Sequence, residues 1–348
     1  MNRELGIGVL GVGDMGRRHA ENIRSLVPGA RLVAVADVNW ERAKKVAGEL
    51  EIEHSFCDLE DMLQCEGVDA VVIASPDKFH ADSIATAAAA GKAIFCEKPI
   101  ATNLLDAHSA LRAVARAGVH LQIGFMRRYD SAHRQAIRRI EAGEIGEPVI
   151  FKSIGRDKDV PPISAYQSNV NGMLFYNSTI HDFDLARWLM RDEISKVQAY
   201  CTVAIRPEVG HYGDVVASVV NLKYEHGAIG NVESYVQALY AYDVRTEVVG
   251  SKGSIFIGSM EKTPVTFLAA NGAVHVLEDH YLSRFAEAYV LEMKDFVENV
   301  VRERPPRVTG DDGLKALAIA VAAENSHFGG DPCEVSIEVA EMAGKGDL

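Results

Sequence analysis

Short apolar runs alternate with helix-like segments along the first 125 residues of the chain. Continuous apolar strands that alternate with helices are typical of a parallel sheet covered on both faces. We therefore predict an α/β domain with a doubly wound parallel sheet. Its predicted strands are 5–10, 31–36, 68–74, 93–96 and 120–124, and its predicted helices are 16–26, 40–50, 80–90 and 103–117.

The pattern changes in the second half of the chain. Longer segments with alternating apolar and polar positions, separated by glycine-containing turns, predict a mixed and largely antiparallel sheet. We expect an α+β domain, joined to the first by a hinge near 125–150. Its predicted strands include 215–224, 228–238 and 244–249, and its predicted helices lie at about 172–190, 282–303 and 311–327.

Apolar side chains recur along these strands, at Val216, Val220, Ile229 and Val232. Helices can cover one face of such a sheet, and the other face then needs a partner. We therefore expect a homo-oligomer, either a tetramer or a dimer.

Composition narrows the class of protein. The 348 residues are 48% hydrophobic and 24% charged, which suits a globular protein of about two domains. A formal net charge of −13 disfavours nucleic acid or an anionic membrane as partner. The five cysteines form no CxxC pair and the histidines show no ligand spacing, so we expect neither disulfides nor a metal. Without a signal peptide or a long apolar stretch, the expected location is the cytoplasm.

A GxGxxG motif, Gly11–Gly16, follows the first predicted strand and opens the first predicted helix. The first glycine allows a tight turn, the second lets a pyrophosphate approach, and the third packs the helix on the strand. The helix N-terminus then faces the phosphates. This motif predicts dinucleotide binding by Gly11, Gly13, Asp14, Met15 and Gly16.

An acidic residue, Asp37, ends the second predicted strand, 21 residues beyond Gly16. A carboxylate at this place accepts the hydroxyls of the adenosine ribose and repels a 2′-phosphate. Arg42 is the first arginine after it. We therefore predict NAD rather than NADP as cofactor.

Two further strand ends carry polar groups. In doubly wound sheets, ligands bind beyond the carboxyl ends of the strands. Ser75, Pro76 and His80 follow one such end and are predicted to line the nicotinamide side of the cofactor, although His80 suits a contact at a helix N-terminus better than chemistry. Glu97 and Lys98 follow the next. Lys98 could polarise a substrate oxygen or could be a solvated lysine beside a turn.

A predicted helix places Asn177, His181 and Asp184 at i, i+4 and i+7, on one face. This polar face could belong to a pocket or could be an exposed amphipathic surface.

Four motifs occur along the chain in this order: Gly11–Gly16, Glu97-Lys98-Pro99, residues 124–130 and residues 179–187. Together they resemble the Gfo/Idh/MocA oxidoreductases, and most of all the inositol 2-dehydrogenase branch. The resemblance implies an NAD-binding Rossmann domain over residues 1–125 and a substrate-binding and oligomerisation domain over residues 126–348. It implies that hydride leaves a secondary hydroxyl of a cyclitol or sugar.

The resemblance also implies residue roles. His181 would accept the hydroxyl proton, and Lys98 would contact the developing carbonyl oxygen. Arg127, Asp157 and Asp184 match positions that line the polyol pocket.

The chain departs from that branch at two positions. It has Asn177 where an Asp usually stands four residues before the catalytic His, and Tyr176 where Arg is typical. Asn177 cannot ionise, so the proton path or the substrate differs. Two alternatives stay open: a glycosidase assisted by bound NAD, and an NAD(H)-binding regulator without turnover.

Overall fold

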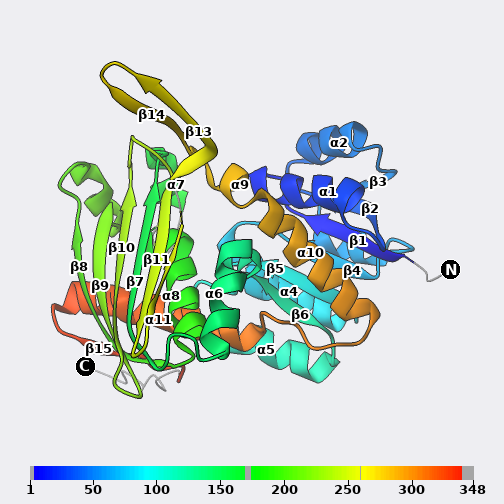
Figure 1. Ribbon diagram of the computed structural model, residues 1–348. Coiled ribbons are helices and arrows are strands. Elements are labelled where there is room, and N and C mark those ends of the chain that lie inside the picture. The colour runs from blue at the N-terminus through cyan, green and yellow to red at the C-terminus, as the bar shows by residue number, and fades with distance from the viewer. Residues whose placement is uncertain (1–3, 169–173, 259, 339–348) are drawn as a thin grey trace.

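Two β-sheets dominate the computed structural model, which describes residues 4–168, 174–258 and 260–338 (Figure 1). The first sheet has the order β3-β2-β1-β4-β5-β6, and all its pairs are parallel. This confirms the predicted doubly wound sheet, whose strand order reverses between β1 and β4. Its strands are β1 (Leu5–Leu10), β2 (Ala30–Ala36), β3 (His54–Phe56), β4 (Ala70–Ile73), β5 (Ala93–Glu97) and β6 (Leu121–Gly124).

Helices cover both faces of this sheet. Side-chain caps fix several of their N-termini: Asn39, Asp58 and Asn103 each accept from a backbone N–H three residues later. The helices are α1 (Asp14–Leu26), α2 (Trp40–Glu49), α3 (Leu59–Gln64), η1 (Asp77–Phe79), α4 (His80–Ala89) and α5 (Leu104–Ala117). β3 and α3 lie in a stretch for which we predicted no element, because each is too short to show a period.

The second sheet has the order β12-β11-β7-β10-β9-β8-β15. Among its described strands β7 and β10 pair in parallel, and the other neighbours are antiparallel, which confirms a mixed, largely antiparallel sheet. Its strands are β7 (Pro148–Asp157), β8 (Ile194–Thr202), β9 (Ala217–Tyr224), β10 (Ile229–Val236), β11 (Asp243–Gly250), β12 (Ser254–Ile257) and β15 (Cys333–Glu334).

The remaining helices come from the part of the chain after β6. α8 and α11 pack against the second sheet, and α11 also contacts α5 of the first domain. The first two positions of the helix predicted at 172–190 lie outside the described residues. The helices are η2 (Met126–Tyr129), α6 (Ser131–Glu141), α7 (Ile163–Ser168), the π-helix η3 (Leu174–Thr179), α8 (Ile180–Met190), η4 (Pro207–Tyr212), α9 (Tyr281–Arg284), α10 (Ala286–Val301) and α11 (Gly310–Gly329).

Helix α10 returns from the second half of the chain to the first sheet. Its Met293 and Phe296 share an apolar core with Ile7 and Val9 of β1. The domain boundary at residue 125 stays a prediction. Because α10 comes after this boundary in sequence but packs on the first sheet, the chain returns to the first domain. No helix among the described residues combines the length and apolar character needed to cross a membrane.

One face of the second sheet is open and partly apolar. Val216, Val220 and Val232 are buried, so three of the four residues that suggested an uncovered face lie in the core. Ile229 is 54% exposed. Val219, Tyr200 and Phe256 are exposed on strands of the same sheet. The hairpin of β13 (Glu261–Ala269) and β14 (Gly272–Leu277) stands out from the rest of the molecule, with exposed apolar side chains (Figure 1).

Candidate active site

The turn between β1 and α1 is shaped for a phosphate group. Gly11 has φ +80°, and a Cβ there would lie 2.6 Å from the carbonyl oxygen of Ala74. A Cβ at Gly16 would collide with the carbonyl oxygen of Gly11. A Cβ at Gly13 would meet nothing within 4 Å, and within the described residues no side chain caps the N-terminus of α1. This open turn and uncapped helix N-terminus therefore suit a pyrophosphate.

Asp37 follows β2 and is 4% exposed. Its Oδ2 accepts from the backbone N–H of Val12 at 3.0 Å, and its Oδ1 from that of Asn39 at 2.8 Å. These bonds hold the carboxylate beside the glycine turn, where the adenosine ribose of a dinucleotide binds. Arg42 Nη1 also donates to Oδ2, at 3.3 Å. The residues present thus fit NAD.

A cavity of about 370 Å³ opens beside this turn, between the two sheets. That volume suits a small-molecule site. The predicted site residues that line it are Met15, Ser75, His80, Glu97, Lys98, Arg127, Asp157, Asn177 and His181. The cavity lining does not include the predicted cofactor residues Gly11, Gly13, Asp14, Gly16, Asp37 and Pro76. Most of these residues lie in the glycine turn or at the end of β2, where the adenosine half of a dinucleotide binds.

Lys98 and Asn177 meet inside the cavity. Lys98 follows β5, and Asn177 lies in the π-helix η3. Lys98 Nζ donates to the side-chain Oδ1 of Asn177 and to its backbone oxygen, at 2.9 Å each. The amide therefore fixes the direction of the lysine side chain.

His181 lies in the first turn of α8 and is 8% exposed. Burial lowers the pKa of its imidazole well below the usual value, and the positive charges of Lys98 and Arg127 lower it further. Its Nδ1 has no hydrogen-bond partner among the described residues. The ring edge contacts Phe125, with centroids 6.0 Å apart. His181 is therefore a neutral imidazole at the cavity.

Two carboxylates line the cavity beside these groups. Asp182 Oδ1 accepts from Arg127 Nη1 at 2.7 Å and from Ser153 Oγ at 2.6 Å. Asp157 Oδ2 accepts from Ser178 Oγ at 2.9 Å. Burial raises the pKa of Asp157, and the Ser178 hydrogen bond and nearby Arg127 oppose that rise. The cavity thus offers donors and acceptors side by side, which suits a molecule with several hydroxyls.

The structure does not bring Asp184 to this cavity. Its carboxylate binds Arg128, which donates from Nε at 2.8 Å and from Nη2 at 2.5 Å. The expected i, i+4, i+7 face began at Asn177, but residues up to Thr179 form a π-helix, so the α-helical spacing does not hold across that join. Asp182 takes the cavity position instead.

His80 joins two loops beneath the cavity. Its Nδ1 lies 2.7 Å from the carbonyl oxygen of Pro99, and its Nε2 lies 2.8 Å from that of Ser75. The ring thus ties the loop after β4 to the segment that carries Lys98. Sequence reasoning missed several further lining residues, whose only signal is their place in the fold: Asp77, Arg156, Asp159, Ser178, Asp182, Tyr242, Tyr281 and Tyr289.

A dinucleotide turn that opens beside a lysine and a neutral histidine defines a dinucleotide-dependent oxidoreductase. Two family models match the chain: the oxidoreductase family, NAD-binding Rossmann fold, over residues 5–125, and the oxidoreductase family, C-terminal alpha/beta domain, over residues 137–335. The chain belongs to this family, the Gfo/Idh/MocA oxidoreductases. The match confirms the resemblance, the fold class and NAD as cofactor.

Individual relatives are similar over nearly their whole length. Scyllo-inositol 2-dehydrogenase (NAD(+)) of Bacillus subtilis is 39% identical and covers 98% of this chain and 99% of its own. Myo-inositol 2-dehydrogenase of Thermotoga maritima is 36% identical, over 92% and 95%. Scyllo-inositol dehydrogenase of Lactobacillus casei, solved with bound NAD(H) and scyllo-inositol, has a TM-score of 0.91 at 30% identity, over 95% and 99%.

Proposed function

We propose that this protein is an NAD-dependent dehydrogenase that oxidises one secondary hydroxyl of an inositol-type cyclitol. The observation that carries the proposal is the cavity, where Lys98 and His181 lie among polar side chains beyond the glycine turn. The relatives named above act on scyllo- and myo-inositol, which supports a cyclitol over a linear substrate.

His181 supplies the base in this proposal. Its lowered pKa keeps the imidazole neutral at physiological pH, so a ring nitrogen is free to accept the hydroxyl proton. NAD, when bound, takes the hydride from the same carbon. Burial excludes water from the base and strengthens its interactions with charged neighbours.

Lys98 supplies the positive group. Its ammonium can donate three hydrogen bonds, and Asn177 accepts two of them through its side-chain and backbone oxygens. A remaining N–H can point at the substrate oxygen, where negative charge develops as the proton leaves. The lysine thus stabilises the reacting oxygen while His181 removes the proton.

Arg127 and Asp157 are proposed to hold the other hydroxyls of the ring. Arg127 is fixed by Asp182, and its Nε has no partner among the described residues. Asp157 is fixed by Ser178 and accepts hydrogen bonds. Asp184, whose carboxylate binds Arg128 outside the cavity, has no place in this proposal.

Initial rates of NADH formation test the proposal. The purified protein is assayed with scyllo-inositol, myo-inositol, glucose and a linear polyol, each with NAD and NADP. We expect turnover with at least one inositol and NAD. Hydrolysis of aryl glycosides without net NADH would favour the glycosidase alternative, and tight NAD(H) binding without any turnover would favour the regulator.

We also propose a homo-oligomer, a tetramer or a dimer, that closes the open sheet face. Exposed Ile229 and Val219 support this because they lie on the adjacent strands β10 and β9, and Phe256 is exposed on β12 of the same sheet. All five cysteines are free, which supports a reducing compartment, the cytoplasm.

A further inference from the structure

A buried carboxyl group lies behind the active-site segment and takes no part in the chemistry above. Glu292 projects from α10 and is 0% exposed. Neither of its carboxyl oxygens has a hydrogen-bond partner among the described residues. An ionised carboxylate in such a place would have lost its hydration without any compensation.

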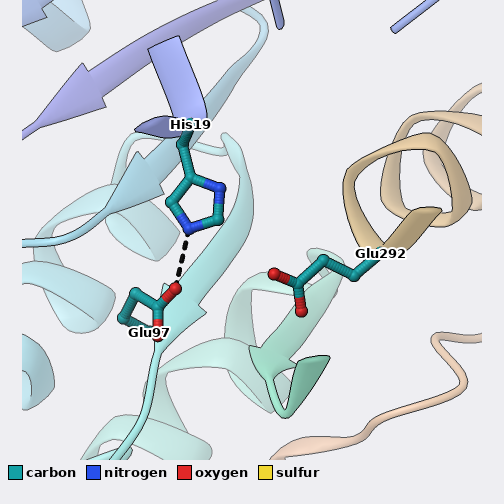
Figure 2. A group of neighbouring side chains, drawn as sticks. All are labelled: His19, Glu97 and Glu292. Atoms are coloured by element: carbon teal, nitrogen blue, oxygen red, sulfur yellow. Dashed lines mark hydrogen bonds and ion pairs between the residues drawn. The ribbon is translucent and has the colours of Figure 1, made fainter. Parts of the chain in front are cut away.

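Two ionisable residues face Glu292 across the gap between α10 and the first sheet. His19 comes from α1 and Glu97 from the end of β5, and Figure 2 shows the Glu292 carboxylate pointing toward this pair. One ligand-type atom from each of the three lies within 4.8 Å of the others. His19 Nε2 and Glu97 Oε1 are 2.7 Å apart. Tyr129 of η2 and Tyr289 of α10 are the other titratable groups nearby.

Glu97 has an ordinary partner, and Glu292 does not. Burial raises the pKa of Glu97, but the His19 hydrogen bond and Lys98 outweigh it, so the net shift is downward. Burial and the negative charge of Glu97 both raise the pKa of Glu292 far above its usual value. Two carboxyl groups this close share one negative charge, and the geometry assigns that charge to Glu97.

We propose that Glu292 is a neutral carboxylic acid at physiological pH, which donates a hydrogen bond to the Glu97 carboxylate through one bridging water molecule, because the two groups lie within 4.8 Å but beyond direct hydrogen-bond distance, and so positions the Glu97-Lys98-Pro99 segment. Glu97 itself lines the cavity beside Lys98, so the bond acts one residue from the reacting groups. Gly124 leaves room for this arrangement, since a Cβ there would lie 3.2 Å from Glu97 Oε2. Glu292 is therefore a positioning residue, and its effect on turnover rests on the proposed function.

Three variants separate this role from simple packing. Glu292→Gln keeps a neutral donor and the same shape, Glu292→Leu removes the donor, and Glu287→Gln removes an exposed carboxylate from the same helix as a matched control. Difference infrared spectra report a protonated carboxyl group directly, through a carbonyl band that shifts in D₂O. We expect wild type and Glu287→Gln to show this band, and both Glu292 variants to lack it.

Stability against pH gives a second readout that needs no activity. An unfolded Glu ionises above a pKa of about 4.3, whereas folded Glu292 keeps its proton, so the contribution of Glu292 to wild-type stability falls as pH rises from about 5 to 8. Glu292→Gln has no carboxyl group to titrate, so it lacks this loss of stability with rising pH. Its Tm relative to wild type should therefore increase with pH over that range, while the Tm difference of Glu287→Gln should stay flat.

Kinetics test the positioning role. Glu292→Gln should retain most of the wild-type kcat, and Glu292→Leu should lose about tenfold in kcat, the effect of one hydrogen bond to a charged group, with KM for NAD little changed. A missing infrared band, or a stoichiometric divalent metal lost in Glu292→Gln, would overturn the neutral acid. An intact band with equal kcat loss in both Glu292 variants would overturn the positioning role. Lack of turnover in wild type would overturn only the proposed function.

Discussion

Lys98 Nζ donates to both the side-chain oxygen and the backbone oxygen of Asn177, at 2.9 Å each. The resemblance to the inositol 2-dehydrogenase branch implies an Asp at this position, and this chain has a neutral amide there. The partner that holds Lys98 is therefore uncharged. Burial is the main cause of the lowered pKa of His181, and the charges of Lys98 and Arg127 lower it further. No carboxylate at residue 177 offsets the charge of Lys98.

Asn177→Asp should raise the pKa of His181, since a negative charge favours the imidazolium and offsets Lys98. His181 must be neutral to accept a proton, so the acidic limb of kcat/KM should move to higher pH, by about one unit. The ranking of polyols should also change, because an amide can donate to a substrate hydroxyl and a carboxylate cannot. The pH profile of kcat/KM over a polyol panel measures both effects.

Asn271→Asp, at an exposed position in the turn between β13 and β14, is the control for added charge and should leave the profile unchanged. If Asn177→Asp left both the pH profile of kcat/KM and the order of preference among polyols unchanged, the side chain of Asn177 would serve only to hold the local backbone.

His181→Gln should alter the dependence of stability on pH. The folded-state pKa of His181 lies well below the unfolded value of about 6.5. Below pH 6.5 the unfolded chain therefore binds a proton at residue 181 that the folded chain does not, and the contribution of His181 to wild-type stability falls as pH drops. The variant lacks this proton uptake, so its Tm relative to wild type should rise as the pH is lowered from 7.5 to 5. Thermal unfolding at several pH values measures this, and a constant difference would mean that His181 is not buried in neutral form.

Asp37→Ser combined with Val38→Arg should shift the cofactor preference toward NADP. The first change removes the charge that repels a 2′-phosphate, and Val38 is 93% exposed, so an arginine there has room to meet the phosphate. The ratio of kcat/KM for NAD to that for NADP should fall by at least tenfold. Val38→Arg alone is the control and should have a smaller effect. Comparable wild-type kcat/KM with both cofactors would contradict the role of Asp37.

Ile229→Lys should weaken self-association. Ile229 lies on β10 in the open sheet face and is 54% exposed, so a lysine would place a charge inside the proposed interface. Multi-angle light scattering at micromolar concentration should show an oligomer for wild type and smaller species for the variant. Leu105→Lys, at an exposed apolar position of α5, should leave the assembly intact. A monomeric wild type would remove the basis for this interface.

The sequence predicted the long elements well because their apolar patterns are strong. The strands from β1 to β6, with the exception of β3, and the helix after the glycine turn lie close to their predicted positions. β3 has three residues, too few to show alternation, and its pairing with β2 decides its conformation. The β13–β14 hairpin is exposed along β13 and at most positions of β14, so no buried face marks it in the sequence.

The glycine turn and Asp37 were predicted from their places after strands. The positions of Lys98 and His181 left two interpretations open, and their roles were predicted only from the family resemblance. Asp182 was missed in favour of Asp184, because the π-helix before α8 changes the spacing that linked Asn177 to that face. Glu292 was missed because a lone acidic residue in a helix normally reaches solvent, and only the tertiary contact with Glu97 shows otherwise.

We propose above that His181 removes the hydroxyl proton of a cyclitol and Lys98 stabilises the reacting oxygen, while NAD accepts the hydride from the same carbon. The direct test is the initial rate of NADH formation with scyllo- and myo-inositol by wild type, Lys98→Met and His181→Ala, alongside NAD binding to each. We predict turnover by wild type, a loss of roughly 10²–10⁴-fold in kcat for each variant, and retained NAD binding. Losses below tenfold in both variants would show that the chemistry takes place elsewhere.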